Sequence, residues 1–579
     1  MTSAPSSQHP FTPEWTGTGI SRGFSVGPAV LITPKKELDH SRPFTSSDLE
    51  IARFETAHQQ VRIHLRSLIS RAGSEVGAEE ALIFEAHLMM IDDPEITEPV
   101  RNAILNEKLI PESAIQRVFG SQMQVFLQSD SEYLRERAVD LKDLETQLLD
   151  QLQPGTAGSV NVSNSGIWIM EDLSPSQVMK LDRSKILGLI IEHGGATSHS
   201  AILARSLGIP AVSGLPGILS LIQDGAMIAI DGKEGSVFLA HDQATQEYFK
   251  KRAIEHQDQV RDLENFRGKL SLTHDLHELK LYANIGGIND ADQAAASDAE
   301  GVGLFRTEFV FMGRKQAPGF DEQRKIYRKI LSLFEGKEVV MRTLDIGGDK
   351  PIDYLPIPKE DNPFLGVRAI RYCLKNPELF KTQIRAMLAA NEWGNLSILI
   401  PMVSRASEAK EVLRLIEECE NDLIQKGEYH DQPYRVGAMV EVPSLIFEMR
   451  ELRESVSFVS VGTNDLMQYA MAADRGNNEL KTLHTPYHLG FLRMMHHLAK
   501  EGERHGLDLG ICGELGGQED LIPLWVAMGY RKLSMVASDI LSRRRCLSKL
   551  TLPQCEGVLH EILEMRDERH IRPFLQSIR

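Results

Sequence analysis

The stretch Phe458-Val459-Ser460-Val461-Gly462-Thr463-Asn464-Asp465 sets the pattern for the C-terminal half of the chain. Its short apolar run predicts a buried strand, and the glycine followed by polar residues predicts the loop after it. The same order of strand, polar loop and helix recurs from Gly268 to the end of the sequence. Eight strand candidates can be counted there, at 279–285, 303–305, 338–343, 396–403, 436–440, 458–461, 507–512 and 532–536. Eight such units predict a (β/α)8 TIM barrel.

Short β-branched runs also precede this region, at 26–33, 160–170, 186–191, 211–212 and 227–237. They predict the strands of a smaller α/β domain. Between the first two runs, apolar residues recur at spacings of three and four, which predicts helices. Breaks in this helical pattern fall at Gly73, Gly77, Pro94 and Pro111. The helical segment is therefore expected to be an insertion within the α/β domain.

The predicted fold class is α/β, with the chain divided into five parts. These are a disordered N-terminal tail over residues 1–16, an α/β domain over 17–46 and 153–240, an inserted helical subdomain over 47–152, a linker helix over 241–268, and the barrel over 269–579. The linker contains no proline and only sparse apolar positions, a pattern typical of a long exposed helix.

Composition excludes several classes of protein. Of 579 residues, 42% are hydrophobic and 25% are charged, as in an ordinary globular chain, and the net charge is −17. An acidic chain is a poor general binder of nucleic acid or anionic membranes. No run of 18 apolar residues occurs, so no membrane insertion is expected. The N-terminus lacks the pattern of a secretory signal, and a cytoplasmic location is expected.

The helical segment carries much of the negative charge. Residues 48–150 contain 20 acidic and 10 basic side chains. Two interpretations remain open, a solvated helical bundle or a docking surface for a basic partner.

A histidine motif follows the predicted strand at 186–191. It reads Gly194-Gly195-Ala196-Thr197-Ser198-His199-Ser200-Ala201-Ile202-Leu203-Ala204-Arg205. The glycine turn and the hydroxyl residues place His199 in the first turn of a helix, where free N–H groups and the dipole favour an anion. A neutral imidazole is a nucleophile, and its phosphorylated form would suit that position. The structural alternative is a surface histidine beside a helix cap.

Charged and polar residues lie at or after the ends of successive predicted barrel strands. They are Arg306, Glu308, Arg342, Asp345, Asn362, Arg368, Glu441, Asn464, Asp465, Arg475, Cys512 and Glu514. The carboxyl ends of barrel strands form the active site in this fold. Several arginines can hold phosphate and carboxylate oxygens, and Glu441 with Asp465 could share a Mg²⁺ ion. The pattern predicts a site for a small polyanion.

Cys512 has two interpretations. A free cysteine is commonly a small buried apolar residue. Beside the arginines, its thiol could instead act as a proton donor. The five cysteines form no C-x-x-C pair, so a redox or zinc protein built on Cys512 has little in its favour.

These motifs together resemble enzyme I of the bacterial phosphoenolpyruvate:sugar phosphotransferase system, over almost the whole chain. The resemblance implies a swivelling α/β domain whose His199 carries a phosphoryl group. It implies that phosphoenolpyruvate is held by Arg306, Arg342, Asn464 and Arg475, with Arg368 in the same substrate-binding motifs. It further implies that Glu441 and Asp465 bind Mg²⁺, that Cys512 protonates the enolate, that the helical insertion docks the phosphocarrier protein HPr, and that the barrel forms a homodimer.

The sequence departs from the family pattern at two places. Ala196 stands where the family often has a basic residue, and the loop His484-Thr485-Pro486-Tyr487-His488-Leu489 lacks a second proline. Both departures spare the residues assigned to catalysis and put in doubt only local loop structure and the tuning of His199.

Two alternative functions follow from the same residues. Pyruvate phosphate dikinase and phosphoenolpyruvate synthase share the histidine domain and barrel but need a nucleotide-binding domain. Fewer than 200 residues precede His199 here, and no G-x-x-x-x-G-K-[ST] loop occurs. The second alternative is an inactive or regulatory relative that binds HPr or phosphoenolpyruvate without turnover.

Overall fold

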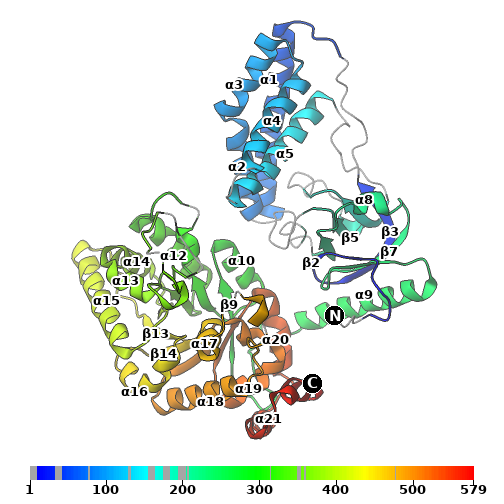
Figure 1. Ribbon diagram of the computed structural model, residues 1–579. Helices are drawn as coiled ribbons and strands as arrows, with labels where there is room; N and C mark the ends of the chain where they lie inside the picture. Colours follow the sequence, from blue (N-terminus) through cyan, green and yellow to red (C-terminus); the bar gives the residue numbers. More distant parts are fainter. Residues whose placement is uncertain are drawn as a thin grey trace. The chain divides into compact units, whose positions relative to one another are not determined.

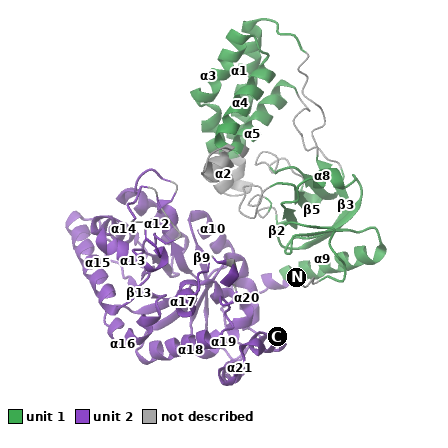
Figure 2. Ribbon diagram, viewed as in Figure 1, with its two compact units in different colours: residues 1–261 green, residues 262–579 purple. Residues whose placement is uncertain are grey.

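A computed structural model describes most of the chain. The described residues are 9–32, 42–75, 78–127, 132–153, 164–173, 183–193, 204, 208–312, 314–348, 352, 354–357, 360–475, 477–480 and 482–578. They form two compact units, residues 1–261 and 262–579 (Figure 2).

The first unit contains an eight-stranded sheet with the order β1-β8-β7-β3-β4-β5-β6-β2. The strands are β1 (Trp15–Thr16), β2 (Thr18–Ser21), β3 (Phe24–Ile32), β4 (Gly166–Met170), β5 (Ile186–Ile191), β6 (Ala211–Ser213), β7 (Met227–Asp231) and β8 (Ser236–Leu239). Strands β3 to β6 pair in parallel, and the others pair antiparallel. Neighbouring strands β3 and β4 are separated in sequence by five helices, so the helical segment interrupts the sheet domain, as predicted.

Both faces of the parallel part of the sheet are covered. In β4, Ile167 and Ile169 belong to one apolar cluster, which includes the short helix α8 (Ile218–Leu221). Trp168 and Met170 alternate with them and belong to a second cluster. All four side chains are buried. Two-sided burial explains why this strand reads as a continuous apolar run and not as an alternating one.

One predicted strand is two strands. The run at 227–237 turns between β7 and β8, where Gly235 has a φ of +71°. The Asp231 carboxylate accepts hydrogen bonds from the backbone N–H groups of Lys233 and Glu234. A tight turn that uses a carboxylate and a left-handed glycine interrupts the strand without breaking the apolar run around it.

The prediction of a disordered tail over residues 1–16 is wrong for residues 9–16. His9 is 8% exposed, and its Nε2 lies 2.9 Å from Asp231 Oδ2. Its ring stacks on Phe249 at 5.5 Å and meets the edge of Phe238 at 5.1 Å. Strand β1 then pairs with β8. Aromatic contacts and backbone pairing with distant segments fix a stretch whose own composition indicated no structure.

The described part of the insertion contains five helices, labelled α1 to α5 in Figure 1. They are α1 (Ser47–Glu75), α2 (Ala78–Ile91), α3 (Pro94–Glu107), α4 (Pro111–Leu127) and α5 (Glu132–Leu152). Pro94 and Pro111, where breaks were predicted, are the first residues of α3 and α4. Proline is tolerated there because the first helical position needs no N–H donor. Helix α1 continues through Gly73, so this predicted break is wrong. Apolar side chains from all five helices form one buried cluster.

The predicted linker is helix α9 (Gln243–Glu264). Asp242 begins it, because its carboxylate accepts hydrogen bonds from the Thr245 N–H at 2.8 Å and the Thr245 hydroxyl at 2.7 Å. Phe249 is buried near the start of the helix, whereas residues 257–262 are exposed on every face.

The second unit is a closed barrel of eight parallel strands surrounded by helices (Figure 1). The strands are β9 (Lys280–Ile285), β10 (Val302–Arg306), β11 (Val339–Arg342), β12 (Leu396–Ile400), β13 (Arg435–Val440), β14 (Phe458–Val461), β15 (Asp508–Ile511) and β16 (Lys532–Met535). The helices are α10 (Ile288–Ala296), α11 (Glu308–Phe311), α12 (Phe320–Leu333), α13 (Ile370–Lys375), α14 (Pro377–Ala390), α15 (Ala406–Lys426), α16 (Met449–Leu452), α17 (Thr463–Met471), α18 (Leu489–Arg504), α19 (Ile522–Met528), α20 (Ile540–Leu547), α21 (Leu552–Glu564) and α22 (Ile571–Ser577). All eight predicted barrel strands are confirmed.

The inside of the barrel is filled by side chains. One buried cluster consists of Leu304, Val340, Leu399, Met439, Phe458 and Cys512. It lies between the two ends of the strands, so the barrel is a packed core and not a channel. Polar residues at the carboxyl ends of the strands are therefore held on a rigid apolar layer.

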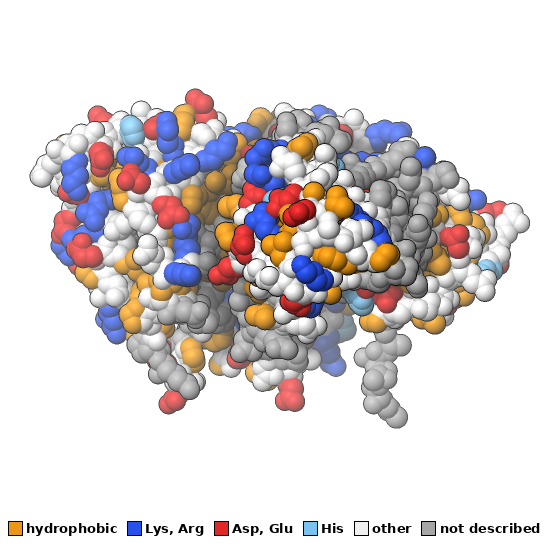
Figure 3. Space-filling view, turned by 90° about the horizontal axis from the view of Figure 1, so that it is seen from above, with side chains coloured by type: hydrophobic (Ala, Val, Ile, Leu, Met, Phe, Trp, Pro, Cys, Tyr) orange, Lys and Arg blue, Asp and Glu red, His pale blue; other side chains and the backbone are white. Residues whose placement is uncertain are grey.

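The surface is mixed in character. On the face drawn in Figure 3, acidic and basic side chains are interspersed with scattered hydrophobic ones. Within the described part of the chain, no helix is both long and apolar enough to span a membrane.

Candidate functional site

The carboxyl ends of the barrel strands enclose a cavity of about 310 Å³. Its lining residues are Leu304, Arg306, Arg342, Asp345, Met439, Glu441, Gly462, Asn464, Asp465, Arg475, Cys512, Gly513 and Glu514. Seven residues assigned from the sequence are among them. Because parallel strands all end at this rim, residues spread over more than 200 positions of sequence meet in one place.

Two buried arginines organise the charges of this cavity. Arg342 donates to Glu308 Oε1 at 2.6 Å and lies 2.9 Å from Asp345 Oδ2. Arg368 lies 3.1 Å from Asp345 Oδ1 and 3.1 Å from Asp465 Oδ1. Acidic and basic groups therefore alternate along Glu308, Arg342, Asp345, Arg368 and Asp465. Such charges are stable when buried because each has a partner.

Arg368 lies outside the cavity lining. It is 1% exposed, and it contacts the carboxylates of Asp345 and Asp465, two residues that do line the cavity. Both of its terminal nitrogens are engaged by these two carboxylates. The structure therefore shows Arg368 in contact with two acidic side chains, and its assignment to substrate binding from the sequence stays a prediction.

Arg306 differs from the other arginines. It is partly exposed in the cavity, and its guanidinium group has no ion pair or hydrogen bond with any residue that the structure describes. Arg475 lies beside it in the lining, 3.7 Å from Asp465 Oδ2. The Asn464 amide donates to Glu514 Oε1 at 3.1 Å. Arg306 is thus a cation ready to take an anionic ligand.

Glu441 and Asp465 supply oxygen atoms suited to a divalent cation. Glu441 is fully buried, and its Oε2 accepts a hydrogen bond from the Met402 N–H at 2.8 Å. Met402 has a φ of +55°, so strained backbone turns this N–H toward the carboxylate. The other oxygen, Oε1, has no hydrogen-bond partner among the described residues. Burial and the nearby Asp465 raise the pKa of Glu441 to about 8. An orphaned, buried carboxylate oxygen of this kind fits a metal ligand.

Gly462 allows the Glu441 carboxylate to lie close to the backbone. A Cβ atom at this position would stand 2.7 Å from both Cγ and Oε1 of Glu441. The glycine in the motif therefore makes room for Glu441, which explains its place directly after strand β14.

Cys512 is buried at the base of the cavity. Its Sγ lies 3.5 Å from the Val461 carbonyl oxygen, and the side chain is 0% exposed. Burial raises the pKa of the thiol to about 12. The thiol is consequently protonated at neutral pH, which is the state that a proton donor requires.

His199 lies outside the described residues. The preceding strand β5 and its end, as far as His193, are described, and the chain is next described at Ala204. Strand β5 is parallel to its neighbours β4 and β6. Its carboxyl end is followed by Glu192, whose carboxylate accepts a hydrogen bond from the Gly217 N–H at 2.7 Å. The motif thus follows the end of a central parallel strand, as predicted.

The sequence analysis missed one polar residue of the barrel rim. Asn284 in β9 donates from its side-chain amide to the Cys512 carbonyl oxygen at 3.1 Å. The sequence feature that could have revealed it is a polar residue within an otherwise apolar strand. Glu308 and Asp345 were noted at strand ends without a role, and their role as arginine partners required the distances.

Comparisons with known proteins show which family the chain resembles. Three segments match PEP-utilising enzymes, namely residues 16–137 the N-terminal domain, residues 162–235 the mobile domain, and residues 260–552 the PEP-binding domain. The phosphoenolpyruvate-protein phosphotransferase of Priestia megaterium is 37% identical over 572 residues, covering 98% of this chain and 99% of the relative. That of Bacillus subtilis (strain 168) is 36% identical over 565 residues, covering 97% and 99%.

These matches extend over both units and include the barrel and the histidine motif. Together with the strand-end cavity, they show that the chain belongs to the phosphoenolpyruvate-protein phosphotransferase family of PEP-utilising enzymes.

Proposed function

We propose that this enzyme transfers the phosphoryl group of phosphoenolpyruvate to its own His199 and then to a histidine of the phosphocarrier protein HPr. The main support for this proposal is the cavity at the barrel rim. It combines the Arg306 guanidinium and Glu441 Oε1, both without a partner among the described residues, with the protonated thiol of Cys512. The relatives are named phosphoenolpyruvate-protein phosphotransferases, a name that supports phosphoryl transfer from phosphoenolpyruvate to a protein.

The arginines of the cavity bind the substrate in this proposal. Arg306 and Arg475 are the more accessible cations, and Arg342 is held rigidly by two buried carboxylates. Guanidinium groups pair with both phosphate and carboxylate oxygens. The side-chain amide of Asn464 lies in the same lining and is proposed to bind the substrate with these arginines. Rigid positioning and charge stabilisation are what phosphoryl transfer requires of a protein.

Mg²⁺ is the proposed cofactor. Five carboxylates and four guanidinium groups meet in and behind the cavity, so a trianionic substrate needs further positive charge there. Glu441 and Asp465 would hold the ion, since Mg²⁺ is usually bound through one or two carboxylates together with substrate oxygens. When bound, the ion neutralises charge on the phosphoryl group and the developing enolate.

His199 attacks the phosphorus, the bond to the enol oxygen breaks, and the new N–P bond forms. Cys512 gives its proton to the carbon of the enolate, which leaves as pyruvate, and the thiolate regains a proton from solvent. A thiol whose pKa is raised by burial holds its proton until a strong carbon base lies beside it. His199 then gives the phosphoryl group to HPr.

The remaining parts of the chain have proposed roles in this cycle. The helical insertion docks HPr, and the α/β domain swivels about the linker so that His199 serves both partners in turn. The barrel forms a homodimer, for which exposed apolar side chains such as Phe447, at 77% exposure, and Leu365, at 64%, supply surface. The enzyme is proposed to act in the cytoplasm.

The test is incubation with phosphate-labelled phosphoenolpyruvate and Mg²⁺, beside the variant His199→Ala. The expected result is acid-labile, alkali-stable label on the wild type alone, with pyruvate released in equal amount and label passed on to added HPr. A folded wild-type protein that takes no label in the presence of HPr would overturn the proposal and favour a relative that binds without turnover.

A further inference from the structure

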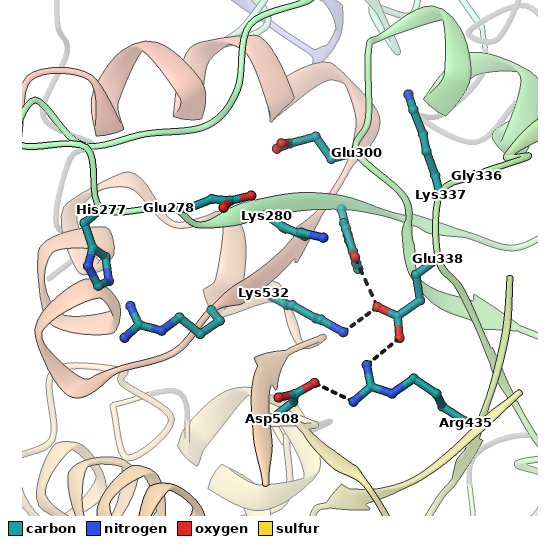
Figure 4. A pocket seen from close by; sticks show the side chains of 12 residues that line it. His277, Glu278, Lys280, Glu300, Gly336, Lys337, Glu338, Arg435, Asp508 and Lys532 are labelled. Carbon is teal, nitrogen blue, oxygen red and sulfur yellow. Dashed lines mark hydrogen bonds and ion pairs between the residues drawn. The ribbon is translucent and has the colours of Figure 1, made fainter. Parts of the chain in front are cut away.

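A second cavity lies at the opposite end of the barrel strands. Its volume is about 660 Å³ (Figure 4). It is lined by His277, Glu278, Lys280, Tyr282, Glu300, Gly336, Lys337, Glu338, Arg435, Asp508, Arg531 and Lys532. No residue is shared with the cavity at the rim, and the apolar cluster inside the barrel separates the two. We name this space the basal cavity.

Part of the basal cavity is a closed ion-pair network. Glu338 accepts hydrogen bonds from Tyr282 at 3.1 Å and Ser397 at 2.7 Å, and it pairs with Lys532 and Arg435. Arg435 also pairs with Asp508. Two acids and two bases balance here, as the dashed lines in Figure 4 show. This network connects the ends of neighbouring strands. Its charges neutralise one another, so none is left unpaired to bind a ligand.

The remaining cations of the basal cavity are not balanced. The Lys280 ammonium and the Arg531 guanidinium form no ion pair or hydrogen bond with any described residue. Among the described residues, the Lys337 ammonium donates to the Ala299 carbonyl oxygen at 2.9 Å, and the nearby acid Asp298 is itself paired with Arg544. The acid Glu300 pairs with Arg544, whose guanidinium lies 3.8 Å away, and it also accepts hydrogen bonds from Ser271 and the Leu281 N–H. Among the described acids that line the cavity, Glu278 is then the only one without a basic partner. It faces three cations, Lys280, Lys337 and Arg531.

The register of the barrel places like charges side by side. Lys280 begins β9 and Lys532 begins β16, and these two residues are paired across neighbouring strands. In Figure 4 both side chains extend into the basal cavity. Glu338 already neutralises Lys532, so the free charge of this pair is that of Lys280. A bound anion would neutralise it.

His277 adds a further donor to this group. Its Nε2 is buried and has no hydrogen-bond partner within the described chain. Burial first, and then the charge of Arg531, lower the pKa of this imidazole. The neutral ring can still donate one hydrogen bond to a ligand oxygen.

We propose that the basal cavity binds a small anion carrying two or more negative charges, through Lys280, Lys337 and Arg531. Phosphate and polycarboxylate groups share this chemistry, since both present several oxygens to ammonium and guanidinium donors. The site is independent of the proposed reaction, because none of its residues takes part in it.

The test is amine acylation of the full-length chain, read residue by residue by mass spectrometry. Inorganic pyrophosphate and citrate serve as two probes, without metal and at ionic strength matched with sodium chloride. At ten times the dissociation constant, acylation of Lys280 and Lys337 should fall about tenfold, because only the free fraction reacts. The exposed Lys410 on helix α15 should be acylated equally with and without the probe.

Variants separate this site from the rim cavity. Arg531→Glu should abolish the protection, with Arg531→Gln as a milder change should the first variant fail to fold. The matched reversal Arg504→Glu, at an exposed arginine of α18, and the rim variant Arg306→Ala should both retain protection. Protection by pyrophosphate alone, by citrate alone or by both identifies the anion class. No protection by either probe, or protection that survives in both Arg531 variants or disappears in Arg306→Ala, would overturn the proposal.

Discussion

Arg368 Nη1 and Asp465 Oδ1 lie 3.1 Å apart, although the two residues are 97 positions apart in sequence. Both side chains are buried, and the other terminal nitrogen of Arg368 contacts Asp345. Asp465 is one of the two carboxylates assigned to the metal. The ion pair therefore fixes the orientation of a proposed metal ligand, and through Asp345 it connects that ligand to Arg342 on the substrate side.

Arg368→Lys is predicted to weaken Mg²⁺ binding more than phosphoenolpyruvate binding. Lysine keeps the charge but cannot bridge two carboxylates, because it lacks the planar fork of guanidinium. Loss of a group that orients a metal ligand typically costs about 10- to 100-fold in metal affinity. The measurement is the Mg²⁺ dependence of His199 labelling at saturating phosphoenolpyruvate.

Arg371→Lys is the matched control, since Arg371 lies in the same segment but donates to the carbonyl oxygens of Leu365 and Gly366. A variant Arg368→Lys with normal Mg²⁺ dependence and a raised KM for phosphoenolpyruvate would instead favour direct substrate contact, as the sequence first predicted.

Arg342→Ala and Arg306→Ala are predicted to differ in stability although both reduce labelling. Without Arg342, the buried carboxylates of Glu308 and Asp345 each lose an ion-pair partner. Breaking a buried ion pair in this way typically lowers the unfolding free energy by about 3–5 kcal/mol. Arg306 has no partner in the described chain, so its removal should change the unfolding free energy by less than about 0.5 kcal/mol. Urea denaturation of both variants checks this, and equal stabilities would contradict the buried ion-pair chain.

Cys512→Ala is predicted to slow pyruvate formation by roughly 10²- to 10⁴-fold, the usual contribution of a positioned proton donor. The control is Cys419→Ala, because Cys419 is equally buried but lies on α15 outside the cavity lining. Pyruvate release is followed in the presence of HPr. Equal rates for the two variants would exclude the thiol as the donor.

The protonation state of Cys512 is testable by alkylation. Burial holds the pKa of this thiol near 12, and only the thiolate reacts. The thiolate fraction is therefore small from pH 6 to pH 9 and grows only as the pH approaches 12. Iodoacetamide at pH 8 should modify the partly exposed Cys546 well before Cys512, with peptide mass spectrometry as the readout. Preferential modification of Cys512 would contradict its buried, protonated state.

His9→Ala is predicted to destabilise the first unit by roughly 1–3 kcal/mol, because the buried Asp231 carboxylate loses a partner. Packing against Phe238 and Phe249 is lost as well. Thermal unfolding is the measurement, beside the exposed His193→Ala in the same unit. Equal unfolding temperatures for the two variants would show that residues 9–16 add no stability.

The barrel could be predicted from sequence because its strands are defined locally. Each is a short apolar run that ends at a polar loop, and eight of them recur at similar spacing. The hairpin of β7 and β8 and the segment around His9 could not be predicted in the same way. One depends on a glycine turn inside an apolar run, and the other on aromatic contacts with residues more than 200 positions away.

The candidate site shows the same division. The residue types at the strand ends of the barrel, from Arg306 to Cys512, indicated a polyanion site before any distance was known. Their individual roles depend on neighbours from other strands. The unpaired state of Arg306, the orphaned oxygen of Glu441 and the position of Arg368 behind Asp465 are properties of tertiary contacts.

The sequence alone thus determined the barrel, the inserted helices, the histidine motif and the set of residues available for chemistry, because these depend on local patterns of apolar, polar and glycine residues. The tertiary structure decided which charges are neutralised and which remain free. The difference is physical, since ionisation and ligand binding depend on burial and on partners within a few ångströms. The two ends of the barrel illustrate this. Arg342 and Lys532 have ion-pair partners, whereas within the described chain the side chains of Arg306 and Lys280 have none.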